Sequence, residues 1–253
     1  MIFYMPNKPI KWGFKLHCMV DNKIHYLFDM IFDPGKKYKE IVASNTKESY
    51  PKQIVLTLVD KLPEKYHRIF TDSWYSSIEL GNEITKRGFS FITTLRVNAA
   101  GLCDKEKIEN SSKQYAYKDK NLILLYKAKK NIYFYTNEKI TTEECKKLYN
   151  MENRGMDKMN QNISYYNCER RVIKWWKKIF FAGIEFACSN TKIIFEKLNN
   201  KKLSDLEFKS ILCEDIGANT DENIEKNQCI PNIYINKLYD ISKFNTKSDC
   251  FYC

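Results

Sequence analysis

Two segments of the chain place acids where metal chemistry is possible. The first, residues 71–77 (TDSWYSS), has Asp72 at the end of an apolar stretch, with aromatic and hydroxyl residues after it. A carboxylate at the end of a strand can hold a hard cation, and the N-terminus of a following helix can receive phosphate. An acid in this setting also caps helices or begins turns, so the segment alone leaves both interpretations of Asp72 open.

The second segment is residues 153–161 (NRGMDKMNQ), in which Asp157 and Asn160 are three positions apart. If a helix begins near Gly155, this spacing puts the carboxylate of Asp157 and the amide oxygen of Asn160 on one face, where both can reach the same ion. An acid in the first turn of a helix also stabilises the helix dipole without binding any ligand. The local sequence leaves this second interpretation open.

The surrounding pattern predicts the elements that hold Asp72. Residues 11–20 and 23–32 are apolar and aromatic runs separated by Asp21-Asn22, which predicts a β-hairpin. Helical spacing over residues 51–62 is followed by a strand over 66–71, a helix over 76–87 with Gly88 as its C-cap, and a strand over 89–95. Such alternation indicates an α/β layer with parallel strands, whose C-terminal edge is where ligands bind. Asp72 falls at that edge.

The chain divides into four segments of different character. Residues 1–97 are expected to form the α/β core, and residues 98–140, with strands over 122–127 and 132–136, a β-rich insertion. Residues 141–200 are expected to be helical, and their longest helix, 172–198, carries one apolar stripe that includes Trp176 as a core residue. Residues 201–253 are polar and rich in Asn, Asp, Glu and Lys, which predicts a linker or tail.

The composition indicates an intracellular protein that attracts polyanions. There are 42 Lys and Arg against 31 Asp and Glu, which gives a formal net charge of +11, and 43% of the residues are hydrophobic, as in a packed domain. No apolar run approaches the ~20 residues of a membrane-spanning helix. Lys8, Lys11 and Lys15 interrupt the stretch that would have to be apolar in a signal peptide.

Taken together, the segments resemble consecutive blocks of the piggyBac-type transposase core. These blocks are KPIKWGFK (8–15), IFTDSWYSS (69–77), TLR (94–96) and YN (149–150) before RGMDKMNQ (154–161). Their order and approximate spacing agree with the family, and the resemblance extends from residue 5 to residue 198. Within this resemblance, the IFTDSWYSS block and the YN and GMD blocks are the most specific for the family.

The resemblance implies a fold and a metal site. The fold would be an RNase H-like mixed sheet flanked by helices, with a β-rich insertion and a helical C-terminal part. In this family three acids bind divalent metal, Mg²⁺ or Mn²⁺, and a further Asp follows the third. By block matching, Asp72 corresponds to the second acid and Asp157 to the third, so both are expected to be catalytic metal ligands. Asn160 stands at the further position, where its lack of charge makes it a weaker ligand.

The family's first acid lies upstream of the KPIKWGFK block, and no residue of this chain matches it. Neither Asp21 nor Asp29 falls at its place. Two-metal phosphoryl transfer needs a carboxylate that bridges the two ions, so we expect the catalytic activity of this chain to be impaired. Two alternatives stay open: a DNA-binding protein without turnover, and a decayed remnant whose first strand is cut short.

The resemblance also implies a DNA partner. Intact members of the family cleave DNA, rejoin it through a 3′-hydroxyl and favour TTAA targets, so double-stranded DNA, a nuclear location and a possible homodimer are expected. Arg170, Arg171, Lys174 and Trp175 match the family's basic and aromatic block, where they can neutralise phosphate and stack on a base. They can equally form a solvated basic face beside tryptophans of the core.

The cysteines and histidines do not point to a zinc site. The nine cysteines lack the close spacing of a disulfide framework. Cys250 and Cys253 form a C-x-x-C pair, which provides only two of the four ligands of a tetrahedral site, so no zinc is expected. His17, His25 and His67 fall in or beside strands and are expected to be structural.

Overall fold

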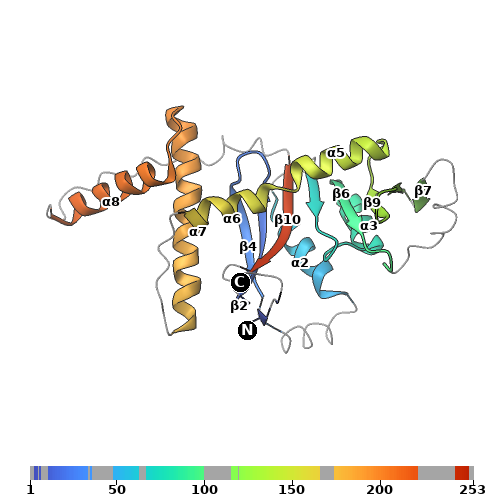
Figure 1. Ribbon diagram of the computed structural model, residues 1–253, viewed down its shortest axis with the longest axis horizontal. Helices are drawn as coiled ribbons and strands as arrows, with labels where there is room; N and C mark the ends of the chain where they lie inside the picture. Colours follow the sequence, from blue (N-terminus) through green and yellow to red (C-terminus); the bar gives the residue numbers. More distant parts are fainter. Residues whose placement is uncertain are drawn as a thin grey trace. The chain divides into compact units, whose positions relative to one another are not determined.

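The computed structural model describes residues 3–4, 6, 11–33, 35, 48–62, 67–99, 115–118, 120–165, 174–221 and 243–250. The chain falls into two compact units. The first comprises Met1–Asp157 together with Ser242–Cys253, and the second is Lys158–Ile241. The first unit is built on a β-sheet, whereas the elements of the second are helical (Figure 1).

Over the described residues, the first unit contains an eight-stranded sheet in the order β4-β3-β10-β5-β6-β9-β8-β7. The strands are β3 (Lys15–Asp21), β4 (Leu27–Phe32), β5 (Arg68–Thr71), β6 (Ser90–Leu95), β7 (Tyr115–Lys118), β8 (Asn121–Tyr126), β9 (Ile132–Thr136) and β10 (Lys243–Cys250). β5 pairs in parallel with β10 and β6, and the other neighbours are antiparallel, so the sheet is mixed. A separate two-stranded ribbon joins β1 (Phe3–Tyr4) to β2 (Trp12–Gly13).

The predicted hairpin is formed by β3 and β4. Its turn is stabilised by Asp21, whose Oδ1 accepts hydrogen bonds from the N–H groups of Lys23 at 2.9 Å and Ile24 at 2.7 Å. All seven residues of β3 are buried, and they include the polar side chains of Lys15, His17 and Asp21 as well as four apolar ones.

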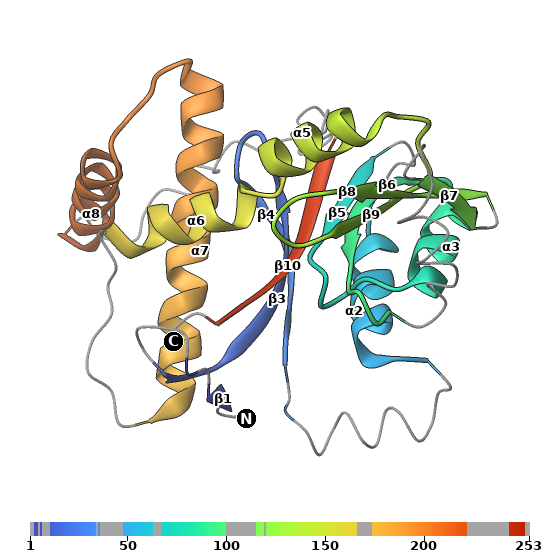
Figure 2. The same ribbon diagram turned by 45° about the vertical axis from the view of Figure 1, so that its right-hand side comes forward.

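β10 brings a distant part of the sequence into the interior of the sheet. It lies between β3 and β5 (Figure 2), and Asn245 pairs with Val20 of β3 and with Phe70 of β5. We expected this part of the chain to be a linker or tail, and one alternative left open was a remnant whose first strand is cut short. The structure differs: the sheet is continuous, because β10 occupies the position between the hairpin and β5.

The β-rich segment expected as an insertion belongs to the same sheet. β9 pairs with β6, with Phe134 opposite Thr94, and β8 and β7 follow on the outer side. β7, β8 and β9 therefore extend the core sheet and do not form a separate body, because β9 returns antiparallel to the edge of β6.

Helices cover both faces of this sheet (Figure 2). α5 (Thr142–Glu152) lies on one face, where Cys145 and Tyr149 pack with Phe70, Ile92 and Phe134. α2 (Tyr50–Val59) and α3 (Ile78–Lys86) lie on the other face. The alternate strand residues point there, and a Cβ atom at Gly81 of α3 would overlap the rings of Phe91 and Tyr135.

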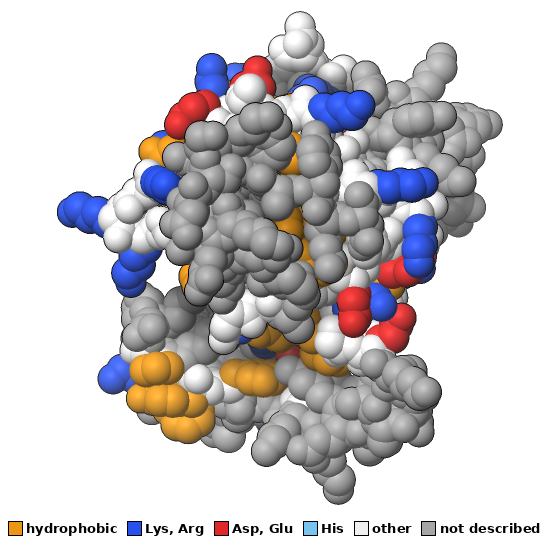
Figure 3. Space-filling model, turned by 90° about the vertical axis from the view of Figure 1, so that its right-hand side faces the viewer, with side chains coloured by type: hydrophobic (Ala, Val, Ile, Leu, Met, Phe, Trp, Pro, Cys, Tyr) orange, Lys and Arg blue, Asp and Glu red, His pale blue; other side chains and the backbone are white. Residues whose placement is uncertain are grey.

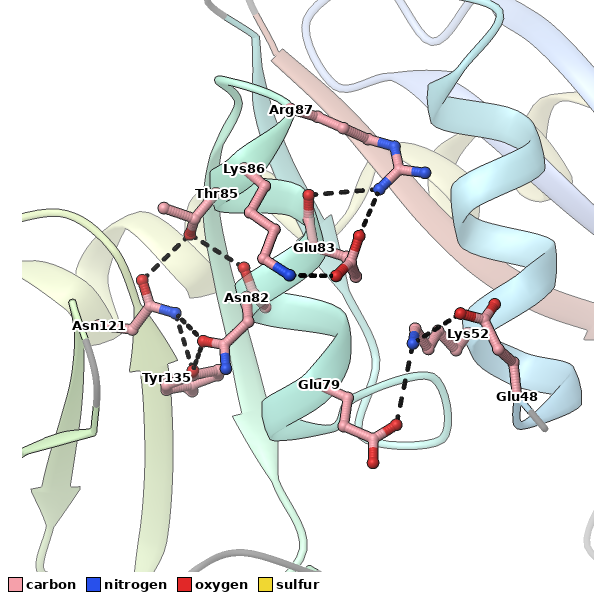
Figure 4. A network of polar contacts seen from close by, with 11 residues as sticks. Glu48, Lys52, Glu79, Asn82, Glu83, Thr85, Lys86, Arg87, Asn121 and Tyr135 are labelled. Atoms are coloured by element: carbon pink, nitrogen blue, oxygen red, sulfur yellow. Dashed lines mark hydrogen bonds and ion pairs between the residues drawn. The ribbon is translucent and has the colours of Figure 1, made fainter.

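A polar network holds α3 against the strands on its own face (Figure 4). Asn121, 1% exposed, donates from Nδ2 to Asn82 Oδ1 and to the Tyr135 hydroxyl, both at 2.8 Å. Its Oδ1 accepts a hydrogen bond from Thr85 Oγ1 at 3.0 Å. On the other side of α3, Glu79 lies 3.8 Å from Lys52 Nζ of α2. These contacts explain how a helix with such a short apolar face is fixed.

The second unit contains most of α6 (Gly155–Tyr165), with α7 (Trp175–Asn199) and α8 (Asp205–Asp221). Glu185 of α7 is 2% exposed and pairs with Lys209 of α8 at 2.6 Å, while the rings of Phe195 and Phe208 lie 5.8 Å apart. None of the described helices has both the length and the apolar character needed to cross a lipid bilayer.

Two predictions for this unit are wrong. Trp176 is 49% exposed and not a core residue, because α7 buries the face of Ala182, Glu185 and Phe186. Residues 205–221 are helix α8 and not a polar tail. Its start is stabilised by reciprocal hydrogen bonds: Glu207 N–H donates to Ser204 Oγ, and Ser204 N–H donates to Glu207 Oε2.

Candidate functional site

Asp72 follows the last residue of β5 and begins a turn that leads to α3. Its carbonyl oxygen accepts hydrogen bonds from the N–H of Tyr75 at 3.0 Å and from Ser76 Oγ at 2.8 Å. The helix itself is capped by Ser77, whose Oγ accepts from Leu80 N–H at 3.1 Å. Asp72 is therefore a turn residue at the C-terminal edge of a parallel strand and not the helix cap.

One oxygen of the Asp72 carboxylate is available for a ligand. Oδ1 accepts a hydrogen bond from Ser73 N–H at 2.5 Å, and no hydrogen bond reaches Oδ2 from the described residues. The side chain is half-buried. A carboxylate that is held at one oxygen can bind a cation through the other without rearrangement.

Three hydroxyl groups fix the strand end that precedes Asp72. Thr71 Oγ1 donates to Thr93 Oγ1 at 2.7 Å, Thr93 Oγ1 is 3.0 Å from the Thr71 carbonyl oxygen, and Ser76 Oγ also bonds to Thr93 Oγ1. These bonds tie β5, β6 and the turn together, so the backbone of Asp72 is held on both sides.

Tyr149 approaches the same strand end from α5. Its hydroxyl lies 3.4 Å from the carbonyl oxygen of Thr71 and 3.5 Å from Thr94 Oγ1. Burial raises the pKa of Tyr149 to about 12, and the negative charge of Asp72 acts in the same direction. The phenol therefore stays protonated at neutral pH and remains a hydrogen-bond donor beside Asp72.

Asp157 lies in the first turn of α6 and is exposed. The start of this helix is fixed by Gly155, which contacts Asn22 at the end of β3: a Cβ atom at Gly155 would overlap Asn22 Oδ1 and lie 3.1 Å from Asn22 Cα. Met156 is fully buried. Asp157 belongs to the first compact unit, which ends at this residue, whereas Asn160 belongs to the second.

The described residues contain no group of three or more His, Cys, Asp or Glu side chains that could hold a metal ion. Asp72 and Asp157 supply two carboxylates from one unit. Carboxylate oxygens are ligands that suit a divalent cation, whereas a pair of metal ions needs a bridging carboxylate as well.

The basic and aromatic block begins α7. Lys174 precedes the helix as its N-cap residue, and Trp175 is 48% exposed. Trp176 is exposed to the same degree, with Lys177 Nζ 5.8 Å from its ring centroid. Arg170, Arg171 and Cys253 lie outside the described residues, and Cys250 is the last residue of β10.

A hollow of about 410 Å³ beside α3 is not part of this site. It is lined by Asn82, Thr85, Lys86, Lys120 and Asn121, none of which is an acid. Lys86 is paired with Glu83 at 2.8 Å. In the space-filling view, Lys and Arg side chains are spread out and several lie beside Asp or Glu (Figure 3), so the described residues on that side form no concentrated basic patch.

Sequence reasoning did not assign roles to Tyr149, Thr93 or His17 around Asp72. His17 in β3 and Thr93 in β6 are polar residues inside buried strands. Because a buried polar side chain needs a hydrogen-bond partner, this pattern could have marked both as members of a polar cluster.

Comparisons with known proteins agree with this fold. The family model described as Transposase IS4 matches residues 1–191. Among solved structures, the piggyBac transposase in a cryo-EM structure of its synaptic complex with hairpin DNA matches with a TM-score of 0.75 and 21% sequence identity. The match covers 90% of this chain and 51% of that chain, so this chain spans about half the length of that protein. The predicted α/β fold class, a mixed sheet flanked by helices, is confirmed, and the fold is that of the piggyBac transposase structure.

Proposed function

Because the chain belongs to the Transposase IS4 family, we propose that it is a piggyBac-type catalytic core that binds double-stranded DNA and a divalent cation at the C-terminal edge of β5. The observation that carries the proposal is the setting of Asp72. Its backbone is fixed by Tyr75 and Ser76, and no residue in the described part of the chain hydrogen-bonds to its Oδ2. In open α/β sheets this edge is where ligands bind.

Asp72 and Asp157 are the proposed ligands of one Mg²⁺ or Mn²⁺ ion, and the sequence gives Asn160 the place of an uncharged auxiliary ligand. When bound, such an ion would neutralise charge on a phosphate of the DNA backbone. Tyr149 would donate a hydrogen bond beside it. Because a pair of metal ions needs a bridging carboxylate in addition to these two acids, we propose that strand cleavage and transfer are impaired in this chain.

The proposed DNA contacts are Lys174 and Trp175 at the start of α7, together with Arg170 and Arg171 before it. Lys174 would neutralise a phosphate, and the half-exposed ring of Trp175 would stack on a base. The net charge of +11 favours such a partner. By resemblance, the DNA would contain a TTAA target, a homodimer would assemble on it, and the protein would act in the nucleus.

A second candidate function is DNA binding without turnover. The net charge of +11 and the half-exposed ring of Trp175 support DNA binding irrespective of any metal site. Both candidates predict phosphate contacts, whereas only the first predicts residual metal-dependent nicking.

Binding and nicking assays separate these possibilities. Affinity for a TTAA-flanked duplex is expected to fall steeply with salt, and Lys174→Ala should reduce the salt slope by about 1. The matched control is Lys139→Ala, at an exposed position of the first unit. Nicking with Mn²⁺ that is lost in Asp72→Asn would show an active core, and binding without nicking would support the second candidate. If affinity does not change with salt, both are wrong.

A further inference from the structure

A histidine inside a buried strand must find partners for two ring nitrogens without help from water. His17 of β3 is 0% exposed, with Nε2 3.1 Å from Asp33 Oδ2 and Nδ1 2.8 Å from the Tyr75 hydroxyl. Since an ionised carboxylate can only accept, Nε2 carries a hydrogen and donates to Asp33. In the neutral ring Nδ1 then accepts from Tyr75, so His17 bridges these two residues.

Asp33 is itself fixed to the backbone at the end of β4. Its Oδ1 accepts a hydrogen bond from Gly35 N–H at 2.9 Å, and its own N–H donates to the carbonyl of Lys15 at 2.9 Å. Gly35 has a φ of 92°, a conformation that glycine adopts without strain. The Asp33 carboxylate therefore has a defined position from which it orients the His17 ring.

On its other side, the His17 ring contacts the turn that follows Asp72. The ring of Trp74 stacks on it, with centroids 5.5 Å apart and planes 20° apart, and the ring of Tyr75 meets it edge-on at 5.8 Å. Lys15 Nζ lies 3.8 Å from the centroid of Trp74. Two residues of β3 therefore hold the two aromatic side chains of this turn.

Hydrogen bonds within the turn connect Tyr75 and Ser73 to Asp72. Tyr75 N–H donates to the Asp72 carbonyl at 3.0 Å, and Ser73 N–H donates to Asp72 Oδ1 at 2.5 Å. A displacement of Tyr75 therefore moves the backbone of Asp72 and turns its carboxylate. β3 and β5 are not neighbours in the sheet, so they share no backbone hydrogen bonds. The contacts of His17 with Trp74 and Tyr75 therefore connect β3 to the turn after β5.

We propose that His17 is a positioning residue, which fixes the direction of the Asp72 carboxylate through Trp74 and Tyr75. The proposal rests on the proposed role of Asp72 as a cation ligand. Its structural part, the restraint on the turn, is independent of any metal.

The restraint is tested by hydrogen exchange at the amides of Ser73 and Tyr75, both of which are bonded to Asp72. Tyr75→Phe removes one hydroxyl and keeps the ring, and these amides are expected to exchange about fivefold faster, the equivalent of one lost hydrogen bond. The control is Tyr135→Phe, which removes another buried tyrosine hydroxyl, bonded to Asn82 and Asn121. If the two amides exchange in Tyr75→Phe as they do in the control, the proposal is overturned.

The consequence for the cation is tested by Mn²⁺ titration, followed by electron paramagnetic resonance. Tyr75→Phe is expected to weaken Mn²⁺ binding about fivefold, by the same lost bond, and Tyr135→Phe to leave it unchanged. His17→Leu should weaken binding further, and His17→Gln, which keeps a donor and an acceptor, should recover part of that loss.

The two proposals fail in different ways. If Asp72→Asn abolishes Mn²⁺ binding while Tyr75→Phe and His17→Leu bind as the wild type does, His17 does not position the ligand and the proposed function stands. If Asp72→Asn binds Mn²⁺ with wild-type affinity, the proposed function fails, and the exchange rates of the two amides alone decide whether His17 restrains the turn.

Discussion

Replacing Gly155 with alanine tests how closely α6 must approach the β3–β4 turn. The added Cβ atom would overlap Asn22 Oδ1 and lie 3.1 Å from Asn22 Cα. The side-chain oxygen cannot simply swing into solvent, because Asn22 is only 8% exposed, and the second contact is with backbone. Either the first turn of α6 or the β3–β4 turn therefore has to move.

The magnitude follows from two opposing effects. Overpacking a close contact costs about 1–3 kcal/mol, and alanine recovers about 0.5–1 kcal/mol relative to glycine in a helix. We expect Gly155→Ala to lower the free energy of unfolding by about 1–2 kcal/mol. In a chain of this size that loss corresponds to a melting temperature lower by about 2–8 °C.

Gly183→Ala is the matched control, because a Cβ atom at Gly183, inside α7, meets nothing within 4 Å. It should stabilise the protein by about 0.5–1 kcal/mol. Thermal and urea unfolding, followed by circular dichroism, measure both variants. Adding Asn22→Ala to Gly155→Ala should restore part of the loss, since the overlapping oxygen is removed. If Gly155→Ala is as stable as the wild type, the close approach of α6 to the turn is refuted.

Three further predictions concern other parts of the fold. Burial raises the pKa of Asp21 despite hydrogen bonds from Ile24 and Lys23, so this carboxyl favours folding when protonated and its contribution is lost as pH rises. Asp21→Asn should therefore melt at a higher temperature than the wild type at pH 7, and the difference should disappear in acid. Equal melting temperatures at pH 7 would show that the charged Asp21 carboxylate does not destabilise the fold. Ser204→Ala removes the cap of α8 and should cost about 0.5–2 kcal/mol, seen as faster amide exchange in that helix but not in α5. Burial raises the pKa of Cys145 to about 12, so iodoacetamide should modify the exposed Cys213 in the native protein and Cys145 only after unfolding, as mass spectrometry of digests would show.

The elements with a strong local pattern were predictable. α2 has apolar residues at helical spacing after Pro51, and α3 ends before Gly88, whose φ of 84° suits glycine. The setting of Asp72 was equally visible, because a strand, a turn and a helix start are encoded within ten residues. These features depend on neighbours in sequence, which is why the sequence alone predicts them.

The features that depend on distant contacts were not predictable. The sequence of β10, KFNTKSDC, is too polar to indicate a strand in the interior of a sheet. The buried face of α7 depends on the pairing of Glu185 with Lys209, which helical periodicity cannot reveal. The bond between His17 and Asp33 likewise requires the hairpin to be folded. The start of α8 is a different case, since Ser204 and Glu207 have the spacing of a capping box and could have been recognised.

The position of β10 has a consequence for synthesis of the protein on the ribosome. β3 and β5 are made early, yet the strand that lies between them comes from residues 243–250, so the sheet cannot be completed before these residues have been translated. Contacts between residues so far apart in sequence form slowly. Until then the nascent chain presents the unpaired backbone groups of two strands, which are sites for pairing with other polypeptides. A protein built in this order would benefit from a chaperone that covers both strand edges during translation.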